Sequence, residues 1–108
     1  NKAVAGFVRG TAEGWKSYFE NPAPGNALIR RDNPNMTDEQ LAYSLVKLKE
    51  MGIVTSGDAS SQGIGVITDA RAKASWDFLA SAKLVDPTKV DLTKTYSTEF
   101  VRDLKVMP

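Results

Sequence analysis

Apolar residues recur every three to four positions over the first stretch of the chain, which is the period of an α-helix. Over residues 4–19 they fall within an arc of about 140°, and the charged residues, which include the i,i+4 pair Arg9 and Glu13, lie on the opposite side. We therefore predict an amphipathic helix. Its inner face consists of Val4, Phe7, Val8, Thr11, Ala12, Trp15, Tyr18 and Phe19.

A second stretch, residues 68–85, is polar only along a narrow stripe formed by Lys73, Asp77 and Ser81. A helix with so little polar surface is normally covered on most sides. We therefore predict that this helix, with Thr68 as its N-cap, is the central element of the fold and that the other helices surround it. The candidates for the centre of the core are Ala72, Trp76, Phe78, Leu79 and Val85.

Local signals define two further helices between these stretches. The prolines of residues 21–25 end the first helix, and a short helix over residues 23–31 can follow. Thr37 and Gln40 have the spacing of a capping box, which predicts the start of a helix that continues to Met51. Gly52 follows this helix at the position where many helices end on a residue in the left-handed conformation, and Ile53 can fold back on the last turn.

The remaining segments are mainly irregular by composition. Residues 55–65 are rich in Gly and Ser and are predicted to be a loop, whose glycines let the backbone turn before Thr68. Residues 88–108 are predicted to be a polar connector, a short helix near residues 97–104, and a loose tail.

Together these elements predict an all-α fold of four to five helices around a central Trp-containing helix, with no sheet, in a single helical domain spanning residues 1–108. The residues expected to be buried are Phe7, Val8, Trp15, Phe19, Leu41, Leu45, Leu48, Trp76, Phe78 and Leu79.

Three glycines form a stripe beside the apolar face of the first helix, at Gly6, Gly10 and Gly14. Each costs up to about 1 kcal/mol relative to alanine in a helix interior, which indicates that something packs closely there. The stripe fits a helix crossing at a partner interface, close packing inside a larger parent protein, or simple tolerance of glycine.

Charge and composition exclude several functions. Lys and Arg total 14 against 13 Asp and Glu, a net charge of +1, so no field of one sign recruits nucleic acid. The chain has neither Cys nor His, which removes thiolate chemistry and the commonest general base and metal ligand. Residues 63–65 (GIG) lack the rest of a phosphate-binding fingerprint. We predict no enzymatic activity, no catalytic residue, no metal and no cofactor.

The order of short segments along the chain resembles the C-terminal third of the periplasmic substrate-binding proteins of ABC importers of the nitrate/sulfonate/taurine type, which are related to thiamine-pyrimidine-precursor binders. The matching segments, scattered over essentially the whole chain, are Gly14-Trp15 with Tyr18, and residues 21–29 (NPAPGNALI), 32–34 (DNP), 36–39 (MTDE), 63–65 (GIG), 68–71 (TDAR), 94–96 (KTY) and 100–101 (FV). One departure is Ala72, because relatives often place an aromatic residue at that position.

This resemblance implies that the chain is a C-terminal fragment of a two-lobed α/β protein that captures a small molecule, of the nitrate, sulfonate, taurine or pyrimidine-precursor class. The expected partners are the N-terminal lobes of the parent and the ABC permease in the membrane, and the expected location is the periplasm, or an exported and membrane-anchored state, of a bacterium. Family ligand contacts come mainly from the absent N-terminal region, so ligand-binding residues are left unassigned.

The chain opens without Met and already within a helical pattern, from which we expect that it belongs to a longer protein. Apolar faces that such a parent would cover could then pair two copies of the fragment, and the first helix is the expected contributor to a homodimer. The alternative to the transport reading is a free-standing helical protein-interaction module without catalytic activity.

Overall fold

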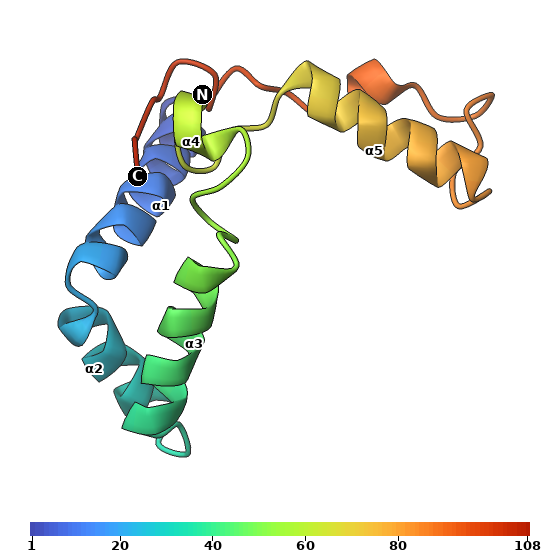
Figure 1. Cartoon of the computed structure of the whole chain (residues 1–108). Helices are drawn as coiled ribbons and strands as arrows, with labels where there is room; N and C mark the ends of the chain where they lie inside the picture. The colour runs from blue at the N-terminus through green and yellow to red at the C-terminus, as the bar shows by residue number, and fades with distance from the viewer.

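The computed structural model describes residues 1–108 and contains five α-helices and no strand, which confirms the all-α prediction (Figure 1). The elements are α1 (Lys2–Glu20), α2 (Ala23–Asp32), α3 (Asp38–Glu50), α4 (Ala59–Gln62), α5 (Asp69–Ser81) and the short 3-10 helix η1 (Leu92–Lys94). The predicted helices over residues 4–19, 23–31 and 37–51 are all present within two residues of their expected bounds.

Both ends of α3 are formed as the sequence predicts. The backbone N–H of Gln40 donates to Thr37 Oγ1 at 3.1 Å, and the backbone N–H of Thr37 donates to Gln40 Oε1 at 3.0 Å. At the other end Gly52 adopts φ +60°, and the Ile53 N–H donates to the Leu48 carbonyl at 3.2 Å. These bonds satisfy backbone groups that the helix ends would otherwise leave unpaired.

Replacing Thr37 with alanine should lower the free energy of unfolding by about 1 kcal/mol, because the Gln40 N–H loses its acceptor at the start of α3. Urea unfolding followed by far-UV circular dichroism measures the loss. Ser44→Ala is the matched control, since Ser44 is exposed in the interior of the same helix. Equal stabilities of the two variants would contradict a stabilising role for the cap.

The helices α1 to α4, which we call the body, form one end of the molecule. The chain passes from α1 to α2 through a tight turn, and α3 runs back beside them (Figure 1). The Tyr18 hydroxyl bonds Asn26 Oδ1 at 2.6 Å across this turn, and Lys49 Nζ donates to the Phe19 carbonyl at 3.1 Å, tying α3 to the end of α1. An ion pair between Arg30 and Asp38 at 2.9 Å ties α2 to the start of α3.

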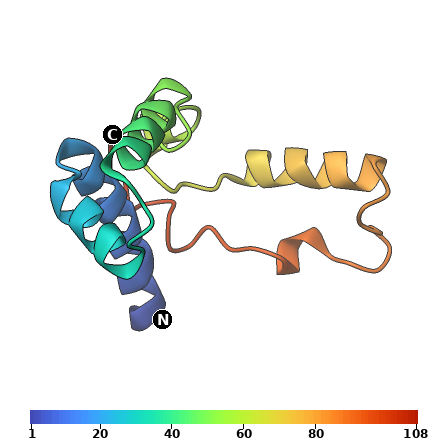
Figure 2. The same ribbon diagram turned by 90° about the horizontal axis from the view of Figure 1, so that it is seen from below.

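Residues 69–96, which we call the arm, project away from the body (Figures 1 and 2). The arm consists of α5 and a return segment that carries η1 and runs back along α5. Ala72, Trp76 and Ala80 are half-buried at a spacing of four residues, and Trp76 borders the same shallow depression as return-segment residues 87–92. Thus α5 is covered along one stripe by its own return segment.

The molecule is open. Its radius of gyration is 16.9 Å, whereas a compact domain of this length has one of about 13 Å. Its accessible surface is 7877 Å², against roughly 5,900 Å² for a compact monomer of the same mass. About 2,000 Å² of surface is therefore exposed that a compact fold would bury. Five of the 108 residues are buried, namely Ala12, Leu41, Ala59, Gly63 and Ile64.

The predicted core is wrong for most of its members. Of the ten residues expected to be buried, Leu41 is buried. The half-buried ones are Val8, Phe19, Leu45, Leu48 and Trp76, and the exposed ones are Phe7, Trp15, Phe78 and Leu79. The apolar faces exist as predicted, but this chain supplies no second layer of helices to cover them.

The expected central position of the 68–85 helix is also wrong, because α5 lies in the arm (Figure 2). It is shorter than predicted as well. Lys83 adopts φ +60° and the Leu84 N–H donates to the Leu79 carbonyl at 2.9 Å, which ends the helix before Asp86-Pro87.

Two other local expectations need correction. The predicted loop at residues 55–65 contains the single-turn helix α4, and residues 97–104 form successive turns in place of a helix. At the glycine stripe, a Cβ added at Gly6, Gly10 or Gly14 would meet no atom within 4 Å, so no element of this chain packs there. The three explanations given for the stripe, a partner interface, a parent protein and simple tolerance, stay predictions.

Candidate functional site

An apolar groove with a volume of about 680 Å³ runs along α1. One wall is the inner face of α1, including Phe7, Thr11 and Trp15. The opposite wall comes from the segment that follows α3, from α4 and from the connector to α5. Amphipathic periodicity places the α1 residues on one face, and the turn after Gly52 brings Ile53 and the next residues opposite them.

The floor of the groove holds three of the five buried residues of the chain. Ala12, Ala59 and Ile64 line it and are each at most 9% exposed. The Ile64 N–H donates to the Val106 carbonyl at 2.8 Å, so the C-terminal tail passes directly beside this point. Three parts of the chain that are distant in sequence therefore meet here: α1, α4 with the residues that directly follow it, and the tail.

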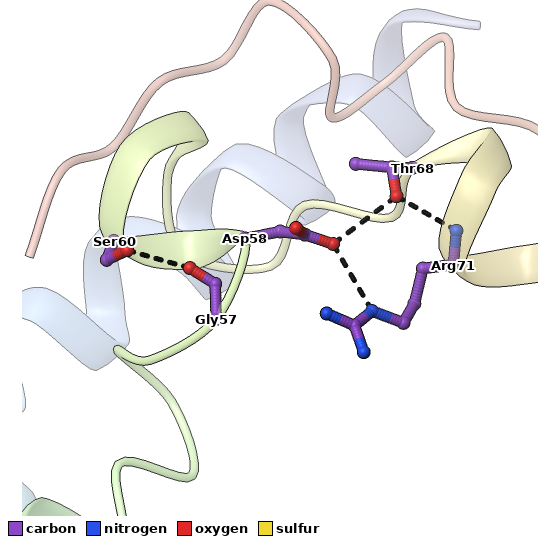
Figure 3. Close-up of polar contacts among 5 residues, drawn as sticks. All are labelled: Gly57, Asp58, Ser60, Thr68 and Arg71. Atoms are coloured by element: carbon purple, nitrogen blue, oxygen red, sulfur yellow. Dashed lines mark hydrogen bonds and ion pairs between the residues drawn. The ribbon is translucent and has the colours of Figure 1, made fainter.

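A polar cluster stands at the rim of the groove, where Asp58 meets the start of α5 (Figure 3). The Thr68 hydroxyl donates to Asp58 Oδ2 at 3.3 Å and accepts from the Arg71 backbone N–H at 3.1 Å as the predicted N-cap. Arg71 Nε donates to the same Asp58 oxygen at 3.4 Å. The terminal nitrogens of Arg71 point away from Asp58 (Figure 3).

The contacts of this cluster brace the start of α5. The side chain of Arg71 is 66% exposed and that of Asp58 is 33% exposed, so the ion pair itself contributes less than about 1 kcal/mol. Its effect is geometric, because one carboxylate contacts both the cap and the first turn of α5. The cluster thereby fixes where the arm leaves the body.

Tyr96 holds the second chain segment at the base of the arm, which is the end of the return segment. Its hydroxyl donates to Asp69 Oδ1 at 2.7 Å, which holds the end of the return segment against the first residue of α5. The hydrogen bond to the Asp69 carboxylate, aided by partial desolvation and by the negative charge of that group, raises the pKa of Tyr96 above its ordinary value.

The contact between Tyr96 and Asp69 should weaken at high pH. Because the folded state holds the phenol proton more tightly than the unfolded state, the stability from this contact is complete below the ordinary tyrosine pKa of about 10 and is lost as the pH rises through the raised value. Phenolate absorbance, taken as the difference between the natural chain and Tyr96→Phe, reports the titration of Tyr96.

Asp69→Ala should return the pKa of Tyr96 toward that of a free tyrosine, since both the acceptor and the charge are removed. Asp77→Ala, in the same helix but paired with Lys73, should leave it unchanged. A Tyr96 titration that is the same in both variants would show that the hydrogen bond does not control it.

The structure confirms parts of the sequence reasoning here and adds others. Gly63 and Gly65 have φ of +111° and +83°, so the predicted backbone turn before Thr68 is present. The pairing of Asp58 with Thr68 and Arg71 was not predicted, because residues ten and thirteen positions apart across a loop carry no periodic signal.

Two further observations bear on possible activities. No group of three or more acidic side chains comes together in a way that could hold a metal ion. None of the helices combines the length and the apolar character that crossing a bilayer requires.

Comparisons with protein-family models, with curated proteins and with solved structures find no match to this chain. The residues and the geometry described above are therefore the basis on which a function can be proposed.

Proposed function

We propose that this chain is the helical C-terminal part of a solute-binding protein that captures a small molecule, of the nitrate, sulfonate, taurine or pyrimidine-precursor class, for uptake by an ABC transporter. The observation that carries the proposal is the excess of about 2,000 Å² of exposed surface over a compact monomer, which fits a part of a larger protein. The resemblance of the short segments supports the class of that protein. Monomeric proteins rarely leave apolar patches of more than a few hundred Å² uncovered.

The exposed faces are those that a larger parent protein would cover. Phe7 on α1 is 77% exposed and Phe78 on α5 is 68% exposed, although both are large apolar side chains. In the proposed parent, the N-terminal lobes pack against these faces. Helices that cover α/β layers in this way need no complete core of their own.

The residues present indicate what this chain and the N-terminal lobes would each contribute to the parent protein. This chain has no His or Cys, and it offers no paired nucleophile and base, so we propose that it has no enzymatic activity. The N-terminal lobes would hold the solute, and the closed protein would deliver it to the permease in the membrane. The location proposed for the parent is the periplasm, or an exported and membrane-anchored state.

We expect the 108-residue chain alone to bind nitrate, alkylsulfonates, taurine and pyrimidine precursors more weakly than micromolar, because the lobes that would enclose the solute are absent. Isothermal titration calorimetry measures this directly. Extending the chain upstream, to include the coding sequence that precedes it, should add alternating strands and helices and give micromolar or tighter binding to one of these solutes.

Two results would contradict the proposal. One is micromolar binding by the isolated chain, which would place a complete site within these residues. The other is an upstream sequence without alternating strands and helices.

The apolar groove favours one other candidate, a free-standing helical module that binds another protein. Its volume of about 680 Å³ and its open, largely apolar lining suit an inserted side chain or helix. An upstream sequence that ends within a few residues, together with an isolated chain that is stable and binds a protein partner, would favour this module over the transport protein.

A further inference from the structure

Two apolar surfaces of this chain face solvent and do not meet each other. The first is the α1 groove, whose wall includes Phe7 (77% exposed) and Trp15 (38%). The second, which we call the arm face, consists of Phe78 (68%) and Leu79 (38%) on α5 and of Leu84 (72%) just beyond the C-terminal end of that helix. Each surface would gain by burial, since covering a large apolar side chain removes it from water.

The arm of a given copy is held away from that copy's own groove. Asp58 fixes the start of α5 through Thr68 and Arg71, and the Tyr96 hydroxyl fixes the end of the return segment to Asp69. Both connections at the base of the arm are thus braced, and the arm projects from the body in both views (Figures 1 and 2). Closing the arm on its own groove would break these contacts.

We infer that two copies of this chain pair reciprocally, with the arm face of each copy lying in the α1 groove of the other. A two-fold axis makes the two contacts equivalent and closes the assembly at two copies. The contacts at the base of the arm stay intact in this arrangement, because the apolar side chains that cover each surface come from the second copy and the arm does not have to move. The pairing is inferred for the 108-residue chain by itself, because in the proposed parent the N-terminal lobes would lie against the same faces.

The available area suits such a dimer. Stable protein interfaces bury about 1,200–2,000 Å² in total, or roughly 600–1,000 Å² from each partner. The excess surface of this chain is about 2,000 Å² per copy, so a dimer that covers half of it reaches this range. The net charge of +1 opposes the approach of a second copy only weakly.

Cysteine cross-linking tests the reciprocal geometry, because the natural chain has no cysteine. Thr11 lines the groove, and Ser75 is exposed on α5 one turn before Phe78 and Leu79. Mixing Thr11→Cys with a size-tagged Ser75→Cys under mild oxidation should give the mixed disulfide as the main product. Glu13→Cys replaces Thr11→Cys as the control, since Glu13 lies on the opposite side of α1, and it should give little.

Sedimentation equilibrium, with far-UV circular dichroism at the same concentrations, tests the energetics. The natural chain should be dimeric at about 100 μM, and its helical signal should rise with concentration because pairing supplies buried surface. Phe78→Ala should weaken dimerisation by about 30-fold, as expected for the removal of a central aromatic contact. Tyr43→Ala, which removes an exposed aromatic on α3 outside both surfaces, should leave it unchanged.

Several outcomes would overturn the inference. They are a monomer at 100 μM, a chain that is non-helical at every concentration, and equal dimerisation of Phe78→Ala and the natural chain. Predominant disulfides between two copies of Thr11→Cys would instead indicate a dimer that pairs α1 with α1 and leaves the arm free.

Discussion

Ile64→Ala is expected to lower the free energy of unfolding by about 2–4 kcal/mol, a large part of the stability that a chain with so few buried residues can have. Ile64 is 4% exposed at the floor of the groove, where α1, α4 and the C-terminal tail meet. Alanine would remove three carbon atoms and leave a cavity at the junction. Urea unfolding followed by far-UV circular dichroism measures the loss.

Ile67→Ala is the matched control, because Ile67 lies three residues further along and is 47% exposed. It should cost less than about 1 kcal/mol, since less apolar surface is lost and no enclosed cavity forms. Equal losses in the two variants would show that the floor of the groove is not the point on which the stability of the body depends.

The sequence predicted those features that depend on a few neighbouring residues. The capping box of Thr37 and Gln40, the left-handed Gly52 and the N-cap at Thr68 each act within four or five positions, so their spacing is visible in the sequence. The bounds of α3 followed from these signals, while the boundary between α1 and α2 followed from the prolines of residues 21–25. The prediction of no sheet followed from the helical period of the apolar residues.

Burial could not be predicted in the same way. Periodicity identifies the side of a helix that suits an apolar neighbour, but it does not say whether the same chain supplies that neighbour. Trp76 and Phe78 illustrate the difference. Both lie on α5, yet the return segment half-buries Trp76, while Phe78 is 68% exposed.

The groove could be predicted from the sequence only in part. The apolar face of α1, which includes Phe7 and Trp15, was predicted to be buried, and it forms a wall of the groove. The opposite wall depends on the path of the chain after Gly52 and on a tail that returns from the far end of the sequence. Neither the tail contact with Ile64 nor the brace at Asp58 has a local signal.

The second large effect is expected for Gly63→Ala, which should lower the free energy of unfolding by about 3 kcal/mol. Gly63 has φ +111° and ψ 155°, a conformation that residues with a side chain rarely adopt. An added Cβ would also lie 3.0 Å from Lys105 Cα and 3.0 Å from the Val106 nitrogen. Because both of these atoms are backbone, the tail must move away, which strains the hydrogen bond from Ile64 to Val106.

Gly65→Ala separates the two causes. Gly65 also has a positive φ, of +83°, but a Cβ there would meet no atom within 4 Å, so the change should cost only about 1–2 kcal/mol for the backbone conformation. In a chain that ends at Leu104 the Lys105 and Val106 atoms are gone, and the cost of Gly63→Ala should fall toward that of Gly65→Ala. If the truncation leaves the cost of Gly63→Ala unchanged, the tail does not pack against α4, and the strain at Gly63 is purely local.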